Sequence, residues 1–415
     1  MGHGHGHGHA HRHLDADSGR HRAGVLADPG VEVGRGPRAV LLLLIVAALA
    51  ATITGLVMLW PDRGAAEAIR DKTSFSAPGV TYPTATVEKP ATTGDSPTLE
   101  VRIGEGEYRD RVVTVQVPPE VAGSGLTRGD AVRLVVTPAS DQSPASFSYF
   151  GTERGSGLWL LGGLFVLVVV AVARWRGLFA IIGLALGGAV IWWFMLPALL
   201  VGEDGVLVGL TGSAAIMLVV LFTTHGFTLR TGTALIGTLA GLLATGGLAV
   251  LAIDHTHLTG ISDESGGILA AYAGPLDFQG LLACAMVVAG LGVLNDVTIT
   301  QASAVWELRE ASATMGRFAL LRSGMRIGRD HIASTIYTIA FAYAGAALTV
   351  LLVIQLYSPP LAELLTTEEI AQEIVRTFVS SIGLVLTVPL TTAVAVLVVP
   401  GPRRRREDDA PATTA

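Results

Sequence analysis

The stretch LLACAMVVAGLGVLNDVTITQASAVWELRE, residues 281–310, changes character halfway along its length. Its first half is apolar enough for the interior of a membrane, where a helix needs about 20 mostly apolar residues to cross roughly 30 Å of hydrocarbon. Asn295 and Asp296 then open a second half that is rich in hydroxyls and acids. The stretch predicts a membrane-spanning helix that carries a carboxylate on its last buried turn.

Composition extends this prediction to the whole chain. Half of the 415 residues are apolar and only 15% are charged, which is too hydrophobic for one soluble core and typical of a membrane protein. The single cysteine, Cys284, excludes a disulfide framework or a cysteine-based zinc site within one chain. Walker A, HExxH and GxSxG motifs are absent from the sequence, so we expect no enzymatic activity.

Eight apolar runs are candidates for membrane-spanning helices. They cover approximately Ala39–Trp60, Leu158–Ala173, Leu178–Val201, Val206–Thr224, Thr231–Ile253, Leu281–Leu294, Ile332–Tyr357 and Thr377–Val399. The chain then divides into a disordered His- and Arg-rich tail (1–38), the first span (39–60), an outer domain (61–157), a seven-helix membrane domain (158–400) and a basic tail (401–415). A secretory signal peptide is the competing interpretation of the first run, but a long polar segment precedes it and no small-residue cleavage site follows.

The distribution of arginine predicts the orientation of these spans. With the N-terminus inside, both tails and the segments around Arg174, Arg230 and Arg309–Arg329 are cytoplasmic, whereas the short outer loops offer only Arg376 and are acidic. Lys and Arg in short loops are retained on the cytoplasmic side. We therefore expect a protein of the cytoplasmic membrane with both termini in the cytoplasm.

The outer domain has the pattern of β-structure. TATVEK, TLEVRI, RVVTVQV and AVRLVV are short, alternating and rich in β-branched residues, with Gly, Pro and Asp between them. The pattern predicts a small antiparallel β-barrel of the OB-like kind. Because no aromatic stacking platform or basic groove is evident, we expect no nucleic acid. An assembly or gating role, with an envelope protein as partner, and a purely structural cap are the open alternatives.

The N-terminal tail is rich in histidine, with His3, His5, His7, His9, His11 and His13 in its first thirteen residues. Imidazoles separated by glycines can share one zinc, nickel, cobalt or copper ion. A divalent metal ion bound at this tail is therefore one hypothesis, and a purification tag or a tail without function is the other.

Three of the predicted spans carry a polar stripe. Residues three or four apart share one side of a helix, and these stripes read Asp296, Thr300, Ser303, Glu307 and Glu310; Asp330, His331, Ser334, Thr335 and Thr338; and Glu373, Thr377, Ser380, Thr387 and Thr391. Ionisable residues at membrane depth usually mark an ion, proton or substrate path. Single hydroxyls more often bond to their own helix or hold helices together. Pro389 frees a carbonyl in the last span, a feature tolerated where it lines a cavity.

Three blocks of sequence resemble a known family. GLGVLNDVTITQASAVWELREA, LLRSGMRIGRDHIASTIYTIAFAYAG and EIVRTFVSSIGLVLTVPLTT are similar to the C-terminal blocks of the YibE/F family of multi-pass membrane proteins, and the resemblance extends over roughly residues 80–400. It implies a multi-pass membrane protein and no specific mechanism. The positions that match are Asp296, Ser303, Gly324, Gly328, Arg329, Asp330, Arg376, Gly383 and Pro389.

The sequence thus predicts a mainly α-helical polytopic membrane protein with a small extracytoplasmic β domain after the first span. We expect a secondary transporter or permease for a cation, such as a divalent metal, or for a small polar solute. Asp296 would be the carrier and Asp330 with His331 its gate or relay. Thr300, Ser334, Thr338, Ser380 and Thr387 would line the path, and Arg329, Arg376, Gly383 and Pro389 would act in gating or structure.

The alternative is a membrane scaffold or envelope-assembly factor. In it, Arg329 and Asp330 would form a helix-start cap and ion pair. Expected partners are the lipid bilayer, further copies of the chain and an envelope protein.

Overall fold

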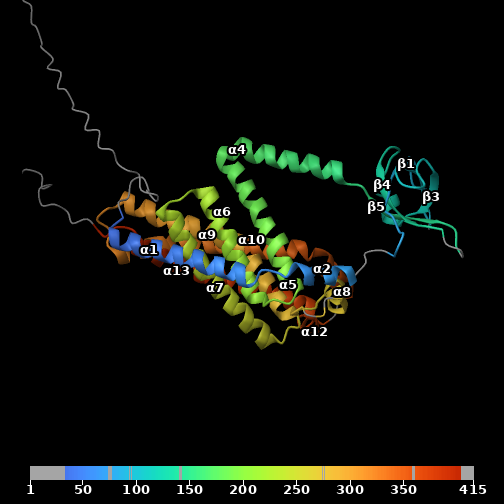
Figure 1. The fold of residues 1–415 in the computed structure, drawn as a ribbon. Helices are drawn as coiled ribbons and strands as arrows, with labels where there is room; N and C mark the ends of the chain where they lie inside the picture. Colours follow the sequence, from blue (N-terminus) through green and yellow to red (C-terminus); the bar gives the residue numbers. More distant parts are fainter. Residues whose placement is uncertain are drawn as a thin grey trace, which may run out of the picture.

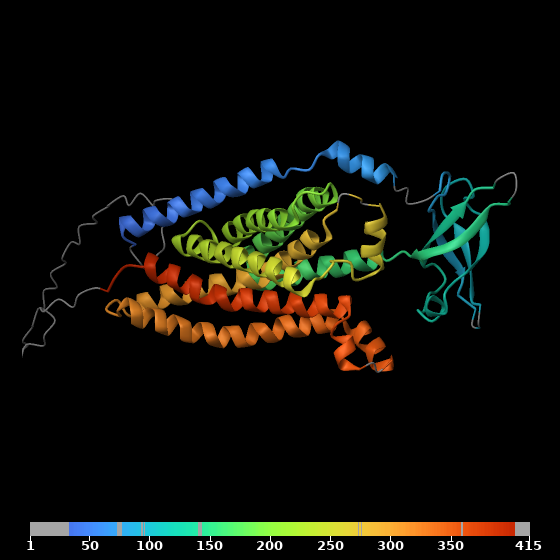
Figure 2. The same ribbon diagram turned by 90° about the horizontal axis from the view of Figure 1, so that it is seen from below.

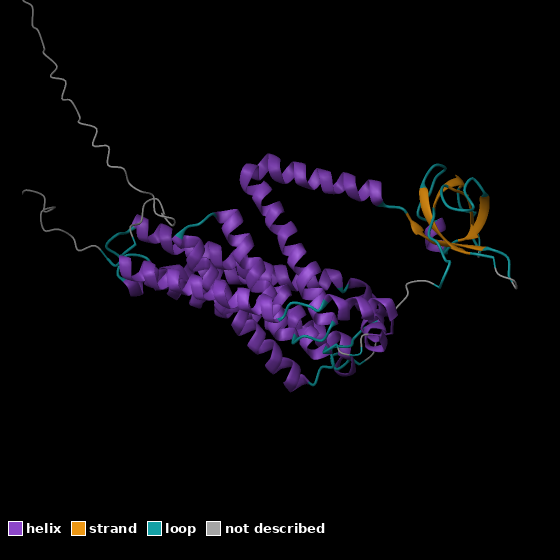
Figure 3. Ribbon diagram, in the orientation of Figure 1, coloured by secondary structure: helices purple, strands orange, loops and turns teal. Residues whose placement is uncertain are grey.

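A computed structural model describes residues 33–72, 77–92, 94, 96–139, 143–272, 274, 276–357 and 360–402. The six histidines of the N-terminal tail and the arginines of the basic C-terminal tail lie outside these residues. Helices build most of the described chain, and all the strands lie in one small domain apart from the helical bundle (Figure 3).

The bounds of the helices are as follows: α1 (Arg35–Met58), α2 (Arg63–Lys72), α3 (Pro119–Ala122), α4 (Gly155–Val190), the π-helix η1 (Ile191–Met195), α5 (Leu196–Leu200), α6 (Gly205–His225), α7 (Leu229–Thr256), α8 (Glu264–Tyr272), α9 (Phe278–Ala311), α10 (Arg317–Ala346), α11 (Leu348–Tyr357), α12 (Leu361–Leu364) and α13 (Glu368–Val398). The strands are β1 (Thr84–Lys89), β2 (Thr98–Ile103), β3 (Val112–Gln116), β4 (Ala131–Thr137) and β5 (Ser146–Thr152).

Several of these helices are long and apolar enough to cross a membrane. Within the described residues six single helices qualify, or seven if α10 and α11, which meet at a bend of 66°, form one span. The second and third predicted runs lie in one continuous helical segment of 46 residues, Gly155–Leu200. Arg174, at φ 54° and ψ −135°, breaks this segment into two arms, and Figure 1 shows α4 turning sharply into the bundle. Counting each arm separately returns the eight predicted runs.

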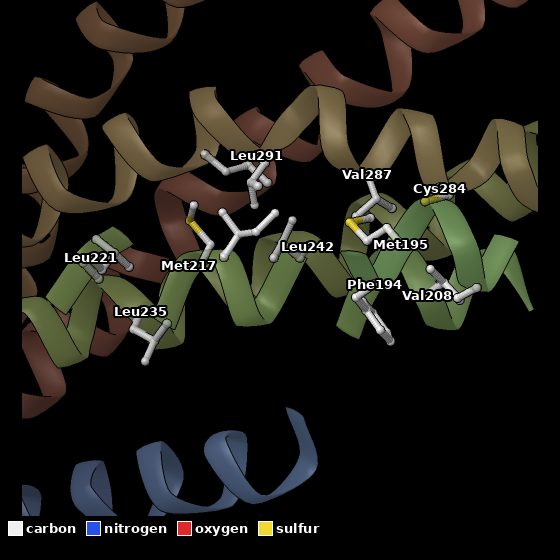
Figure 4. Close-up of a cluster of buried hydrophobic side chains, with 14 of the residues drawn as sticks. Phe194, Met195, Val208, Met217, Leu221, Leu235, Leu242, Cys284, Val287 and Leu291 are labelled. Carbon is white, nitrogen blue, oxygen red and sulfur yellow. The ribbon is translucent and has the colours of Figure 1, made fainter. Parts of the chain in front are cut away.

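Helices α7, α9 and α13 form the centre of the bundle. They pack most closely on one another, while α6 packs on α9, α10 packs on α9 and α13, and α1 lies against α6 and α7. In Figure 2, α10 and α13 run side by side and α1 covers the far side of the bundle. A cluster of buried apolar side chains, including Leu235, Leu242 and Leu291, joins α7 to α9, and Met195 and Met217 extend it toward α6 (Figure 4).

Glycine allows the central helices to approach closely. A Cβ atom on Gly241 would collide with Thr387, and one on Gly383 would collide with Thr245. Each of the helices α7 and α13 thus packs a threonine side chain against a glycine of the other, an arrangement that we call the glycine–threonine interlock. At the end of the bundle where α6 begins, Gly205 and Gly280 bring the backbones of α6 and α9 together in the same way. Glycines spaced four residues apart, such as Gly237 and Gly241 on α7, thus mark close helix packing.

The five strands form one nearly closed antiparallel sheet. Strand order is β3-β2-β1-β4-β5, and β3 approaches β5 across the opening. Val113 and Val115 are buried while Thr114 and Gln116 are exposed, which confirms the alternation expected from RVVTVQV. Leu99, Val101 and Leu134 from neighbouring strands complete an apolar interior.

Candidate functional site

Helices α9 and α10 bring two ionisable side chains together. Asp296 Oδ2 lies 3.5 Å from His331 Nε2, and the two side chains are 66% and 33% exposed. His331 Nε2 makes no hydrogen bond, so the pair is a charge contact and not an aligned hydrogen bond. The contact is an ion pair only when the imidazole is protonated, because a neutral histidine carries no charge.

The Asp296–His331 pair lies on the surface of the bundle, part of the way along α9 and not at the end of the helix. Helix α9 continues unbroken to Ala311, about 22 Å beyond Asp296 at 1.5 Å per residue. Trp306, on that continuation, is buried in one cluster with Leu41, near the start of α1, and Leu229, at the start of α7. Helix α9 therefore does not end at Asp296, and its apolar packing on neighbouring helices extends about three turns further.

Most other members of the first two stripes lie on the surface beside this pair, but Thr335 is buried and Ser303 is half-buried. Thr300, Asp330, Ser334 and Thr338 are exposed. Thr300 Oγ1 donates to the carbonyl of Asp296 at 2.8 Å, and Thr338 Oγ1 donates to that of Ser334 at 3.2 Å. Asp330 and Arg329 are exposed and form no ion pair with another described residue, so the cap and ion pair that we considered for them is not formed.

The third stripe lies elsewhere in the bundle. Thr387 is buried between α7 and α13, where it donates to the carbonyl of Gly383 at 2.7 Å and packs on Gly241. Ser380 is also buried, and its hydroxyl lies close to that of Tyr343 on α10. Pro389 lies on an exposed side of α13, which continues through it as a helix. The structure thus brings the α9 and α10 stripes together, while that of α13 mostly packs against α7.

A buried glutamine that the sequence analysis did not single out ties the three helices together. Gln301 Nε2 donates to the carbonyl oxygen of Gly324 on α10 and to Thr392 Oγ1 on α13, both at 2.8 Å. Gly328 provides space for its side chain, because a Cβ atom there would lie 3.0 Å from Gln301 Oε1, whereas one at Gly324 would crowd Thr392. Glycines four residues apart on α10 were the available sequence signal, and they indicated a close approach without identifying its partner.

A second polar group lies further along α10, on the side that faces α13. Arg376 pairs with Glu373 at 3.2 Å, and Tyr343, also missed in the sequence, lies close to both. These three residues lie at one edge of a groove of about 650 Å³ between α10–α11 and α13, whose remaining walls are mainly alanine and aliphatic side chains. The groove combines an apolar wall with a charged edge, which suits an amphiphilic molecule better than a bare ion.

Several polar atoms inside the bundle have no protein partner. Within the described residues they include the side-chain oxygens of Ser213 on α6, Asn295 on α9 and Thr391 on α13. Buried polar atoms are nearly always paired with protein or water, so each unpaired one marks a place where a polar molecule is favoured. Within the described residues, no three His, Cys, Asp or Glu side chains are grouped so as to hold a metal ion.

One comparison with known proteins identifies a relationship. A family model described as YibE/F-like protein matches residues 161–401. The match includes all three sequence blocks that carry the resemblance, together with Asp296, His331 and Gln301. It begins after β5, so the β domain that the resemblance was expected to include lies outside it. No curated protein and no solved structure matches the chain.

Proposed function

The chain belongs to the YibE/F-like protein family, and from that premise we propose that it is a secondary permease of the cytoplasmic membrane. Its solute is a cation or a small polar molecule. The observation that carries the proposal is the Asp296–His331 contact between α9 and α10. A carboxylate at hydrocarbon depth is costly, and such residues are found where they meet a partner, an ion or water.

The pair has the chemistry of a carrier that is coupled to protons. With His331 protonated, Asp296 is held by an opposite charge; when the imidazole is neutral, the carboxylate is free to bind a cation. Thr300, Ser334 and Thr338 lie on the adjoining surface and can supply neutral oxygen ligands. Binding of a cation and of a proton are then mutually exclusive, which is the requirement for exchange.

The orientation of the bundle supports this assignment. The start of α1, the start of α7 and the end of α13 meet at one end, where Leu41, Leu229 and Val398 share a cluster. The arginines of α1 and of the α9–α10 turn lie near this end, so we assign it to the cytoplasm under the positive-inside rule. Both termini are then cytoplasmic, and the OB-like β domain is extracytoplasmic.

A divalent metal remains the more specific form of the proposal. The tail histidines favour zinc, nickel, cobalt or copper, whereas a path of carboxylate and hydroxyl oxygens favours hard cations. Deletion of residues 3–13 distinguishes a tail that captures metal from a tail without function. If the tail captures metal, its deletion should lower the transport rate at limiting metal. If it has no function, the transport rate should be unchanged.

The test is flux through the purified protein in liposomes loaded with pH-sensitive and cation-sensitive dyes. Asp296→Asn should reduce cation-driven proton movement at least tenfold, since the carrier charge is lost. Asp254→Asn is the matched control, because Asp254 is an exposed carboxylate on another long helix, α7. Equal flux in Asp296→Asn and in the unmodified protein would remove the carrier role.

A membrane scaffold is the second candidate, and the glycine–threonine interlock of α7 with α13 favours it. At this interface the hydroxyls of Thr245 and Thr387 donate hydrogen bonds to carbonyls of their own helices, as threonines in packed helices commonly do. The outer β domain would then bind an envelope protein. Folded protein that carries no cation or proton flux over the whole dye panel would favour the scaffold.

A further inference from the structure

Helices α9 and α10 carry rows of opposite charge side by side on one exposed face. Glu307 and Glu310 continue the line of Asp296 along α9, and Arg322, Arg326 and Arg329 form a row on α10. All six side chains are exposed. Apart from the contact of Asp296 with His331, none of them forms an ion pair with another residue in the described part of the chain.

The arginine row points away from the rest of the subunit. Leu320, Gly324 and Gly328 form the buried side of α10. Arg322, Arg326 and Arg329 lie on the opposite side, because an offset of about two residues corresponds to roughly half a turn.

This row also lies at the depth of the apolar core. Leu320 is packed with Val305 and Trp306 in the cluster that contains Leu41, just past the arginines at the start of α1. Counted from Leu320, Arg322 is about 3 Å further into the bundle and Arg329 about 14 Å. Exposed guanidinium groups that form no ion pair with another described residue can bind an acidic surface of another molecule.

The two rows match in depth as well as in sign. Asp296 lies at the level of His331, and Gln301 lies at the level of Gly324 and Gly328. Glu307 is therefore level with the first turns of α10, near Arg322. The turn between the helices is fixed by Arg309, whose Nη1 donates to the carbonyl oxygen of Met315 at 2.8 Å, so the register of the rows is built into the subunit.

We infer that this face is the interface with a second copy of the chain. A twofold axis along the membrane normal keeps each residue at its own depth and places the acidic row of α9 opposite the arginine row of α10 in the partner. The two α9–α10 pairs form a four-helix core in which every charge row meets its opposite. The Asp296–His331 contact then lies within this four-helix core, where the second copy covers it. The interface does not depend on whether the protein transports a solute.

The interface is tested with the full chain in lipid nanodiscs by mass measurement. The unmodified protein should be a dimer, Glu307→Arg should weaken association at least tenfold, and Glu307→Arg combined with Arg322→Glu should restore it. Glu264→Arg on α8, an exposed acid at the other end of the bundle, is the control and should remain dimeric.

Cross-linking tests the pairing of the rows independently of dimer strength. Two tagged chains, one with Glu307→Cys and one with Arg322→Cys, should form a disulfide when they are produced together. Replacing the first by Val57→Cys, which is exposed on α1, should abolish it. A monomer that retains anionic lipid, and loses that lipid on Arg322→Glu, would overturn the inference in favour of a lipid-binding face. A dimer that is indifferent to both charge reversals would overturn it as well.

Discussion

At the scale of single residues, threonine has two different roles in this bundle. Thr245 and Thr387 donate to carbonyls of their own helices and place their side chains in the spaces left by Gly383 and Gly241. The hydroxyl oxygens of Thr238 and Thr298 form a hydrogen bond of 2.7 Å across the α7–α9 interface. A hydroxyl in the sequence therefore indicates helix packing at some positions and a bond between helices at others.

The close packing of Gly241 on Thr387 predicts that one added methyl group at this glycine destabilises the protein. Gly241→Ala places a Cβ against Thr387 and should lower the free energy of unfolding by about 1–3 kcal/mol, as overpacking does. Gly247→Ala on the same helix is the control, since no atom lies within 4 Å of the Cβ position. It should be neutral or stabilising by up to about 1 kcal/mol. Thermal unfolding in mild detergent measures both, and equal melting temperatures would contradict the interlock.

At the scale of elements, α4 differs from the other long helices. Its first arm, up to the break at Arg174, exposes Leu158, Trp159 and Leu167, whereas the second arm buries Gly183 and Gly187 against α6. The sequence analysis predicts two spans here because two apolar runs flank Arg174 and Arg176. The structure also places a break between the two runs, because Arg174 adopts a positive φ and turns the chain there.

The β domain offers a pH-dependent prediction at the same scale. Hydrogen bonding to Arg102, followed by the charges of Arg102 and Arg128, lowers the pKa of Glu88. A lowered pKa contributes stability that is present above the unfolded value of about 4.5 and is lost as the pH falls through the folded value. Protection of the β1 and β2 amides against hydrogen exchange should therefore fall below about pH 4.5.

Replacement of the carboxyl isolates this contribution. Glu88→Gln should reduce protection at neutral pH and flatten its acid dependence, because the ionised partner of Arg102 is gone. Glu107→Gln is the control, an exposed acid of the same domain that forms no ion pair with a described residue. Acid dependence that is unchanged in Glu88→Gln would assign the loss of protection to other groups.

At the scale of the whole molecule, the two ends of the bundle differ in charge. Arginines gather where α1 begins and where α9 passes into α10, and acids gather in the segments around α8 and α12 at the other end. In Figure 1 the β domain lies toward the end occupied by α2 and α8. This arrangement separates a basic side from a side that carries the β domain.

The arrangement predicts the topology in a cell. A reporter enzyme that is active only in the cytoplasm should be active when fused after residue 402 and inactive when inserted in the β domain, for example between β2 and β3. A membrane-impermeant label should modify a cysteine introduced at exposed Glu107 in intact cells. Reporter activity at both sites would contradict the orientation.

The sequence by itself determined the long apolar helices, four of the five strands and how charge divides between the two ends, but it did not identify β5 or the short helix α2. These features depend on composition and on the local periods of helix and strand, as in the alternation of Val113, Val115 and Val117. Family membership was also available from the sequence, because its blocks are local.

Only the tertiary structure decided which polar residues meet. It paired Asp296 with His331, joined Gln301 to Gly324 and Thr392, and placed Thr387 against Gly241. It also showed that Asp296 lies part of the way along α9, on an exposed side, and not at the end of the helix. A stripe in a sequence specifies one side of a helix, but the rotation and axial register of that helix against its neighbours depend on close packing between distant segments, which no local period contains.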